Sequence, residues 1–297
     1  MLWVPITVAA AIAQLARNAL QSGLTGTVGT LGATMVRFVF ALPFALVAWA
    51  VAVWGMGEPI PGISPGTIEW TLAGALAQIA ATALMLKSMH MRGFAVAYAY
   101  IKTEPVLLAI GGWLLLGDRL PGLAWGGIVI ATAGVIWSAL PKGTTLASMR
   151  GEMGAIAYGV FGGALFGLSS LAFRAAILTL DAEPWMGALH VLTLNLAMQS
   201  AIMLGWLWFA DRKVIGAVFR EWKPSLAAGA TGMLASFGWF TGFALTPAAN
   251  VRTLALIEMP FAALLNRKIS GKHLTEREWI GVSLVILGIL ALVQSAV

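Results

Sequence analysis

The chain has 297 residues, of which 60% are hydrophobic and only 10% are charged, and its mean hydropathy is +0.88. A soluble domain carries roughly 25% charged residues, so we expect lipid to cover much of this apolar surface. A formal charge of +6 would suggest a nucleic-acid partner for a soluble protein. Here the basic residues lie mostly in short loops between apolar runs, which favours lipid head groups and argues against nucleic acid.

Apolar runs long enough to cross a bilayer, which needs about 20 mostly apolar residues, follow one another along the chain. Their approximate bounds are 2–22, 32–53, 69–88, 94–116, 122–140, 153–178, 185–209, 225–245, 249–267 and 278–296. Glycine, proline and charged residues fill the breaks, as in Gly-Glu-Pro-Ile-Pro-Gly at 57–62. The sequence therefore predicts an all-α membrane protein with ten transmembrane helices.

The two halves of the chain repeat each other. The spacing is 155 residues for Gly32 and Gly187, Gly74 and Gly229, and Pro105 and Pro260, and 154 residues for Trp125 and Trp279, Gly127 and Gly281, and Gly134 and Gly288. Each half holds five spans, an odd number, so the second half must enter the membrane from the opposite face. We therefore expect two inverted five-helix repeats, residues 1–141 and 151–297, with a substrate site near the membrane midplane.

Charge in the loops predicts the orientation. Ten basic residues lie in alternate loops: Arg92, Lys142, Arg150, Arg212, Lys213, Arg220, Lys223, Lys268, Lys272 and Arg277. The loops of the opposite face hold Arg119. The positive-inside rule places the first set of loops in the cytoplasm, so both termini are expected in the periplasm.

Two acidic residues, Glu104 and Glu258, lie inside predicted spans, beside the repeated prolines Pro105 and Pro260. A charge at the bilayer centre costs about 2.5–3.5 kcal/mol on insertion scales. One hypothesis is that an acid takes up a proton or binds a substrate ammonium; the alternative is a structural ion pair, with Lys102 or with an arginine of another span. Each proline removes a helical hydrogen bond, which predicts a hinge beside the site or, alternatively, a plain kink.

Other polar and aromatic residues inside spans are candidates for binding the substrate: Gln14, Arg17, Gln78, Tyr98, Lys102 and Trp239. Tyr98 and Lys102 are four residues apart and so share a helix face, where Lys102 would meet a substrate carboxylate or, alternatively, snorkel to the interface. Gln14 and Arg17 form a polar stripe, although Arg17 is also close enough to a span end to anchor there. Trp239 is expected to line a cavity wall.

The segment from Glu104 to Gly134, EPVLLAIGGWLLLGDRLPGLAWGGIVIATAG, resembles the signature of the EamA family of the drug/metabolite transporter superfamily. That signature has a proline in the fourth span, a Gly-Glu-Arg-Leu-like turn, here with Asp118 in place of Glu, and a glycine-rich fifth span. The second copy, Pro260 to Gly288, is weaker. The resemblance covers the chain as two tandem copies. It implies a ten-helix transporter that often exports amino acids, with the fourth span lining the cavity and, against the charge count, with cytoplasmic termini.

These observations together predict a multi-pass transporter of the bacterial inner membrane. It would export small amphipathic metabolites by alternating access. Amino acids, including aromatic and other apolar amino acids, are the expected substrates. The alternative is efflux of cationic drugs or other metabolites, coupled to protons through Glu104 or Glu258. The spans hold no catalytic or metal-ligating set and the chain has no cysteine, so we expect no enzyme, cofactor or metal. The expected partners are a small-molecule substrate and the lipid bilayer, and the sequence is compatible with a monomer.

Overall fold

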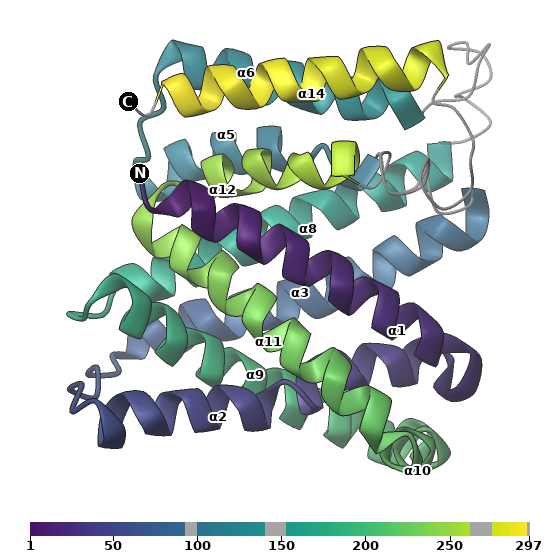
Figure 1. The fold of residues 1–297 in the computed structure, drawn as a ribbon. Helices are drawn as coiled ribbons and strands as arrows, with labels where there is room; N and C mark the ends of the chain where they lie inside the picture. Colours follow the sequence, from purple (N-terminus) through teal and green to yellow (C-terminus); the bar gives the residue numbers. More distant parts are fainter. Residues whose placement is uncertain (93–99, 140–152, 262–274, 296–297) are drawn as a thin grey trace. The chain divides into compact units, whose positions relative to one another are not determined.

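The computed structural model describes residues 1–92, 100–139, 153–261 and 275–295, and the regular elements in these ranges are all helices (Figure 1). In chain order they are α1 (Trp3–Val39), α2 (Leu42–Ala50), the π-helical η1 (Val51–Gly55), α3 (Pro65–Arg92), α5 (Glu104–Leu116), α6 (Gly122–Ala139), α8 (Met153–Leu178), α9 (Pro184–Ala210), α10 (Arg212–Arg220), α11 (Trp222–Leu245), α12 (Ala248–Leu254), the 3₁₀ turn η2 (Ala255–Ile257) and α14 (Glu276–Gln294).

Five helical stretches of the described residues are long and apolar enough to cross a membrane. They are Gly23–Gly55, Pro65–Met85, Gly122–Ala139, Ile156–Leu178 and Pro184–Ala210, and Glu104–Leu116 is a shorter apolar helix. The expectation of an all-helical protein with several membrane-length apolar helices is therefore confirmed. The count of ten spans in inverted repeats stays a prediction.

Contacts divide the chain into two compact units, and each unit combines segments from both halves of the sequence. Unit 1 comprises the described residues of Leu76–Leu171 and Thr246–Val297, together with Met1. Unit 2 comprises Leu2–Ala75 and Ala172–Leu245. These units group residues by contact, so the repeat boundaries predicted from the sequence, 1–141 and 151–297, are not tested by them.

In unit 1, α6 and α14 lie side by side along their length (Figure 1). The repeat relates Gly127 to Gly281 and Gly134 to Gly288. The contacts are crosswise, because each of these glycines touches a member of the other pair. A Cβ atom at Gly127 would lie 2.5 Å from the carbonyl oxygen of Gly288, and one at Gly134 would lie 2.7 Å from that of Gly281. The earlier glycine of α6 thus meets the later glycine of α14, so the two helices run antiparallel and their backbones touch.

In unit 2, α1 packs against α11. The helical backbone is interrupted at Gly29 within α1 and again between α1 and α2. Gly29 has φ 70° and ψ 175°, a conformation that side chains rarely adopt, and it lies in the break predicted between the first two spans. The second predicted span, 32–53, is itself divided, because Pro43 lies in the first turn of α2 and has no N–H to continue the preceding helix.

The structure also contains a helix where the sequence analysis expected a loop. α10 begins directly after α9, and the Asp211 side chain accepts a hydrogen bond from the backbone N–H of Lys213 at 3.1 Å. This contact caps one of the amide groups that a helix start leaves without a partner. The basic residues around position 212 indicated a loop, but they are also compatible with a short helix that begins at the end of a span.

The contact between α6 and α14 predicts a sharp difference between two adjacent glycines. In Gly127→Ala the new methyl group meets the backbone of α14, which moves only with the whole helix, so we expect a loss of about 1–3 kcal/mol. A Cβ atom at Gly126 would have no atom within 4 Å, so Gly126→Ala should be neutral or slightly stabilising. Thermal melting of the purified variants in detergent measures both. Equal melting temperatures for the two would contradict the crosswise glycine contact.

Candidate functional site

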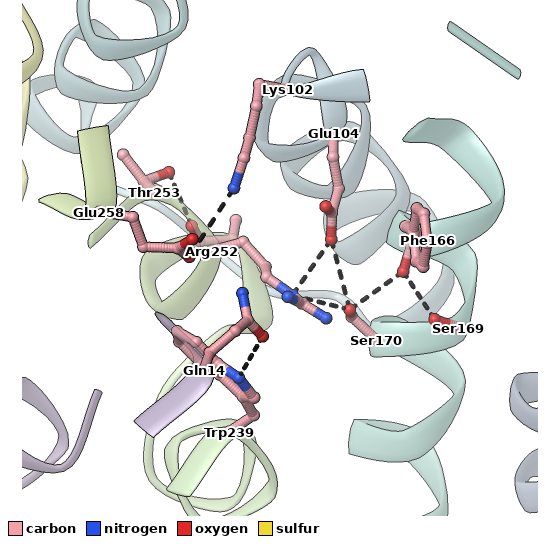
Figure 2. Close-up of polar contacts among 11 residues, drawn as sticks. Gln14, Lys102, Glu104, Phe166, Ser169, Ser170, Trp239, Arg252, Thr253 and Glu258 are labelled. Carbon is pink, nitrogen blue, oxygen red and sulfur yellow. Dashed lines mark hydrogen bonds and ion pairs between the residues drawn. The ribbon is translucent and has the colours of Figure 1, made fainter. Parts of the chain in front are cut away.

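Two buried ion pairs of unit 1 link the segment at the start of α5 to the segment formed by α12 and η2 (Figure 2). Arg252 Nε lies 3.1 Å from Glu104 Oε1, and Lys102 Nζ lies 3.8 Å from Glu258 Oε1. The two carboxylate side chains are 8% and 6% exposed. Each segment supplies one cation and one anion, so the four ionised side chains sum to zero charge.

The pair of Arg252 and Glu104 is the tighter one. Arg252 Nε also donates to Ser170 Oγ at 3.1 Å, and this hydroxyl lies 3.0 Å from the carbonyl oxygen of Phe166 and 3.5 Å from Glu104 Oε1. Ser170 therefore ties the pair to the backbone of α8. The 3.8 Å between Lys102 and Glu258 exceeds the usual range of an N–H···O hydrogen bond, about 2.7–3.2 Å, so this second pair is held by Coulomb attraction in a looser geometry.

The energetics of buried charge explain why the four side chains occur together. Removal of one partner from a buried ion pair costs about 3–5 kcal/mol, because the remaining charge is left uncompensated. The alternative proposed from the sequence was an ion pair with Lys102 or with an arginine of another span. Both ion pairs are present, since Glu258 pairs with Lys102 and Glu104 pairs with Arg252 of another helix. An assignment of these residues to substrate binding stays a prediction.

The repeated prolines explain the irregular backbone that carries these charges. Lys102 and Thr103 form a turn, and α5 begins at Glu104 with Pro105 in its first turn. η2 likewise precedes Pro260. Proline lacks an N–H and its ring clashes with the carbonyl four residues earlier, so a regular α-helix is disrupted before each proline. The single helix predicted over 94–116 is accordingly interrupted at residues 102–103, and the hinge role of the two prolines stays a prediction.

A glycine stripe on α8 accommodates this interruption. The carbonyl group of Ile101 cannot receive the hydrogen bond that residue 105 would donate in a regular helix, because Pro105 has no N–H. A Cβ atom at Gly163 would lie 2.6 Å from this carbonyl oxygen, so only glycine lets the α8 backbone come so near. A Cβ atom at Gly159 would lie 2.5 Å from the Cβ atom of Tyr100. These two glycines, four residues apart, allow the close helix approach that small residues at this spacing favour.

Unit 2 holds a separate group of the predicted site residues. Trp239 Nε1 of α11 donates to Gln14 Oε1 of α1 at 3.0 Å (Figure 2). Arg17, which is 6% exposed, donates to Asn18 Oδ1, and its Cδ would lie 3.1 Å from a Cβ atom at Gly232. The polar stripe of α1 therefore faces α11. Trp239 is buried, with its one N–H satisfied by Gln14, and substrate contact by this group stays a prediction.

The remaining predicted site residues are only partly described. Gln78 is buried in α3, in unit 1. Tyr98 lies outside the described residues, so its predicted place beside Lys102 is not tested. Among the residues that the structure describes, no group of His, Asp and Glu side chains could hold a metal ion.

Two residues of the ion-pair network were missed as site residues. Neither Arg252 nor Ser170 is among the site residues predicted from the sequence. A charge balance over the spans would have found the arginine. Two intramembrane acids require two bases, and Lys102 supplies only one of them. Arg252 lies six residues before Glu258 in the same predicted span, so it is the other base nearest to the acids in the sequence.

Comparison with known proteins agrees with this architecture. No curated protein matches the chain. A solved structure, titled only as the crystal structure of a protein, superposes with a TM-score of 0.73 over 97% of this chain and 95% of that chain, at 16% sequence identity. Such a likeness shows a shared fold and carries no information about the substrate.

A family model gives the more specific result. Residues 153–294 match the EamA-like transporter family, which is the half of the chain where the sequence motif is weaker. Together with the membrane-length apolar helices, this match identifies a multi-pass membrane protein that transports small solutes. The resemblance inferred from the sequence is thus confirmed over residues 153–294, which match the model of the EamA-like transporter family.

Proposed function

We propose that the protein exports small zwitterionic metabolites, apolar and aromatic amino acids in particular, across the bacterial inner membrane by alternating access. The observation that carries the proposal is the crossed network of ion pairs, in which one pair is tight and the other is loose. The tight pair, Arg252 and Glu104, holds α5 against α12. The loose pair, Lys102 and Glu258, is the one that opens to the substrate.

The chemistry of the loose pair matches an amino acid. When Lys102 and Glu258 separate, each loses its ion pair with the other, and a group of opposite charge would compensate for this loss. The carboxylate of an amino acid provides one for Lys102, and its ammonium provides one for Glu258. The exchange leaves the total charge of the buried network at zero, and apolar surroundings would receive the side chain.

The same argument disfavours a net cation. A cationic drug that displaces Lys102 from Glu258 would break the ion pair of the lysine ammonium with Glu258 and add one positive charge to the network. Efflux of cations through a proton-carrying Glu104 or Glu258 requires that the acid give up its basic partner during each cycle. The short contacts from Arg252 to Glu104 and Ser170 oppose this at Glu104.

Two features support alternating access by inverted repeats. The glycines that the repeat relates meet crosswise between the antiparallel helices α6 and α14, as a two-fold axis between inverted halves requires. The helix is also irregular just before both Pro105 and Pro260. Interrupted helices at repeat-related positions are a recurrent feature of transporters, where they carry the substrate site and move around it. We infer that the two prolines mark the hinges.

Paired substitutions test the loose pair. Lys102→Gln and Glu258→Gln should each destabilise the protein, because each removes the ion-pair partner of a buried charge, and the double variant should recover most of the stability. It should not recover transport, because both groups that hold the zwitterion are gone. We expect its apparent affinity for labelled phenylalanine to fall about 10–100-fold, the effect of losing hydrogen bonds to charged groups. Counterflow in proteoliposomes and thermal melting of the same preparations provide the two measurements.

The double variant Glu104→Gln/Arg252→Gln is the matched comparison, since it removes the other pair of the same two segments. It should lose more stability and less substrate affinity than the Lys102 and Glu258 double variant. If the Lys102 and Glu258 double variant transports phenylalanine with unchanged affinity, that pair has a purely structural role and the proposed site is wrong.

Competition experiments test the substrate class. Unlabelled leucine and phenylalanine should compete with labelled phenylalanine, whereas phenethylamine and 3-phenylpropionate should compete at least about tenfold more weakly, because each lacks one of the two charges and cannot compensate for the broken ion pair at both Lys102 and Glu258. Equal competition by phenethylamine, with a pH dependence that disappears in Glu104→Gln or Glu258→Gln, would support proton-coupled efflux of cations instead. Flux without saturation would indicate a channel.

A further inference from the structure

We propose that α10 and the residues that flank it form a binding surface for the head groups of anionic phospholipids. The inference is independent of the transported substrate. It starts from the position of the helix. α9 is one of the membrane-length apolar helices and ends at Ala210, and α10 begins two residues later at Arg212. α10 therefore lies where the chain leaves the hydrocarbon core, at the level of the lipid head groups.

The two faces of α10 differ in chemistry. At 100° per residue, the basic residues Arg212, Lys213 and Arg220 fall within about a third of the helix circumference, and all three are exposed. Val214 and Val218 lie on the opposite side, and Val218 is fully buried. The helix thus has one basic face and one apolar face, the pattern of a helix that lies in a membrane interface.

Contacts with α1 fix the apolar face of α10. A Cβ atom at Gly32 of α1 would lie 3.0 Å from Cγ2 of Val218. Beside this face, the ring of Phe219 lies 5.6 Å from the ring of Phe40, the residue that follows α1. Because α1 holds this face, the basic face cannot roll inward and is presented outward by the fold. The surface is therefore built before any lipid binds.

Tryptophans at both ends of α10 strengthen the assignment to a lipid interface. Trp208 and Trp222 are 53% and 49% exposed, and tryptophan is enriched at the level of the head groups. The Arg212 guanidinium carbon lies 4.3 Å from the ring centroid of Trp208, and Lys223 Nζ lies 5.6 Å from that of Trp222. Each cation is thus held near an aromatic anchor while it stays exposed to solvent.

The charge of this surface selects the lipid. Arg212, Lys213, Arg220 and Lys223 face two nearby acids, Asp211 and Glu221, which leaves a net charge of +2. Among the described residues, no carboxylate forms an ion pair with any of the four basic side chains. Asp211 instead caps the helix. Basic residues beside a bilayer attract anionic lipids, so we commit to a head group with net negative charge, such as phosphatidylglycerol, over zwitterionic phosphatidylcholine.

Native mass spectrometry of the detergent-purified protein, titrated with phosphatidylglycerol or phosphatidylcholine of identical acyl chains, tests the proposal. The protein should retain phosphatidylglycerol preferentially. Each basic residue near an anionic surface contributes about fivefold to the affinity, so Arg212→Gln/Lys213→Gln/Arg220→Gln should weaken phosphatidylglycerol binding on the order of 100-fold. The control Lys87→Gln/Arg119→Gln/Arg277→Gln removes the same charge elsewhere and should keep the preference.

Two further measurements on the unaltered protein keep the test decisive even if the triple variant fails to fold. The preference should decline as salt is raised, because exposed charges are screened, and inorganic phosphate should not displace the lipid, since it cannot contact the tryptophans through an acyl chain. Equal retention of both lipids, retention insensitive to salt, displacement by phosphate, or an unchanged preference in the folded triple variant would each overturn the proposal.

Discussion

The cost of a charge in an apolar interior is the constraint on which unit 1 depends. Lys102, Glu104, Arg252 and Glu258 are nearly buried, and none is tolerable there alone. Each of the two segments carries one cation and one anion, and each charge is paired with the opposite charge on the other segment. The pairs therefore hold the start of α5 and the α12 segment together, and they do so without leaving a net charge for lipid to accommodate.

The backbone is arranged to bring these charges together. Pro105 and Pro260 each remove a helical hydrogen bond, and the chain before each is irregular. Irregular backbone inside a membrane persists only where protein or water satisfies it. The glycines of α8 supply that protein surface on one side, since Gly163 admits the carbonyl oxygen of Ile101. The prolines thus interrupt the helices that carry the charged residues, and the glycines of α8 make room for the interrupted backbone.

The sequence predicted the apolar helices, and it offered ion pairs with Lys102 or with an arginine of another span as one interpretation of Glu104 and Glu258. It did not assign a partner to each acid, because helix packing brings Arg252 to Glu104 and Lys102 to Glu258 across about 150 residues of chain. The Gln14 and Trp239 contact was missed for the same reason. α10 was missed because a nine-residue amphipathic helix stands out less than a span, and its basic residues also suit a loop.

The transport cycle that we propose depends on the difference between the two ion pairs, one tight at 3.1 Å and one loose at 3.8 Å. Two tight pairs would lock α5 to α12, because a substrate would have to match hydrogen bonds that the fold already satisfies. With two loose pairs, no strong contact would hold α5 against α12 while the ion-pair partners exchange. With Arg252 held by both Glu104 and Ser170, the loose pair can separate while total charge and helix contact are maintained. In the mechanism we propose, a zwitterion would complete this exchange, since it would return one opposite charge to each of Lys102 and Glu258.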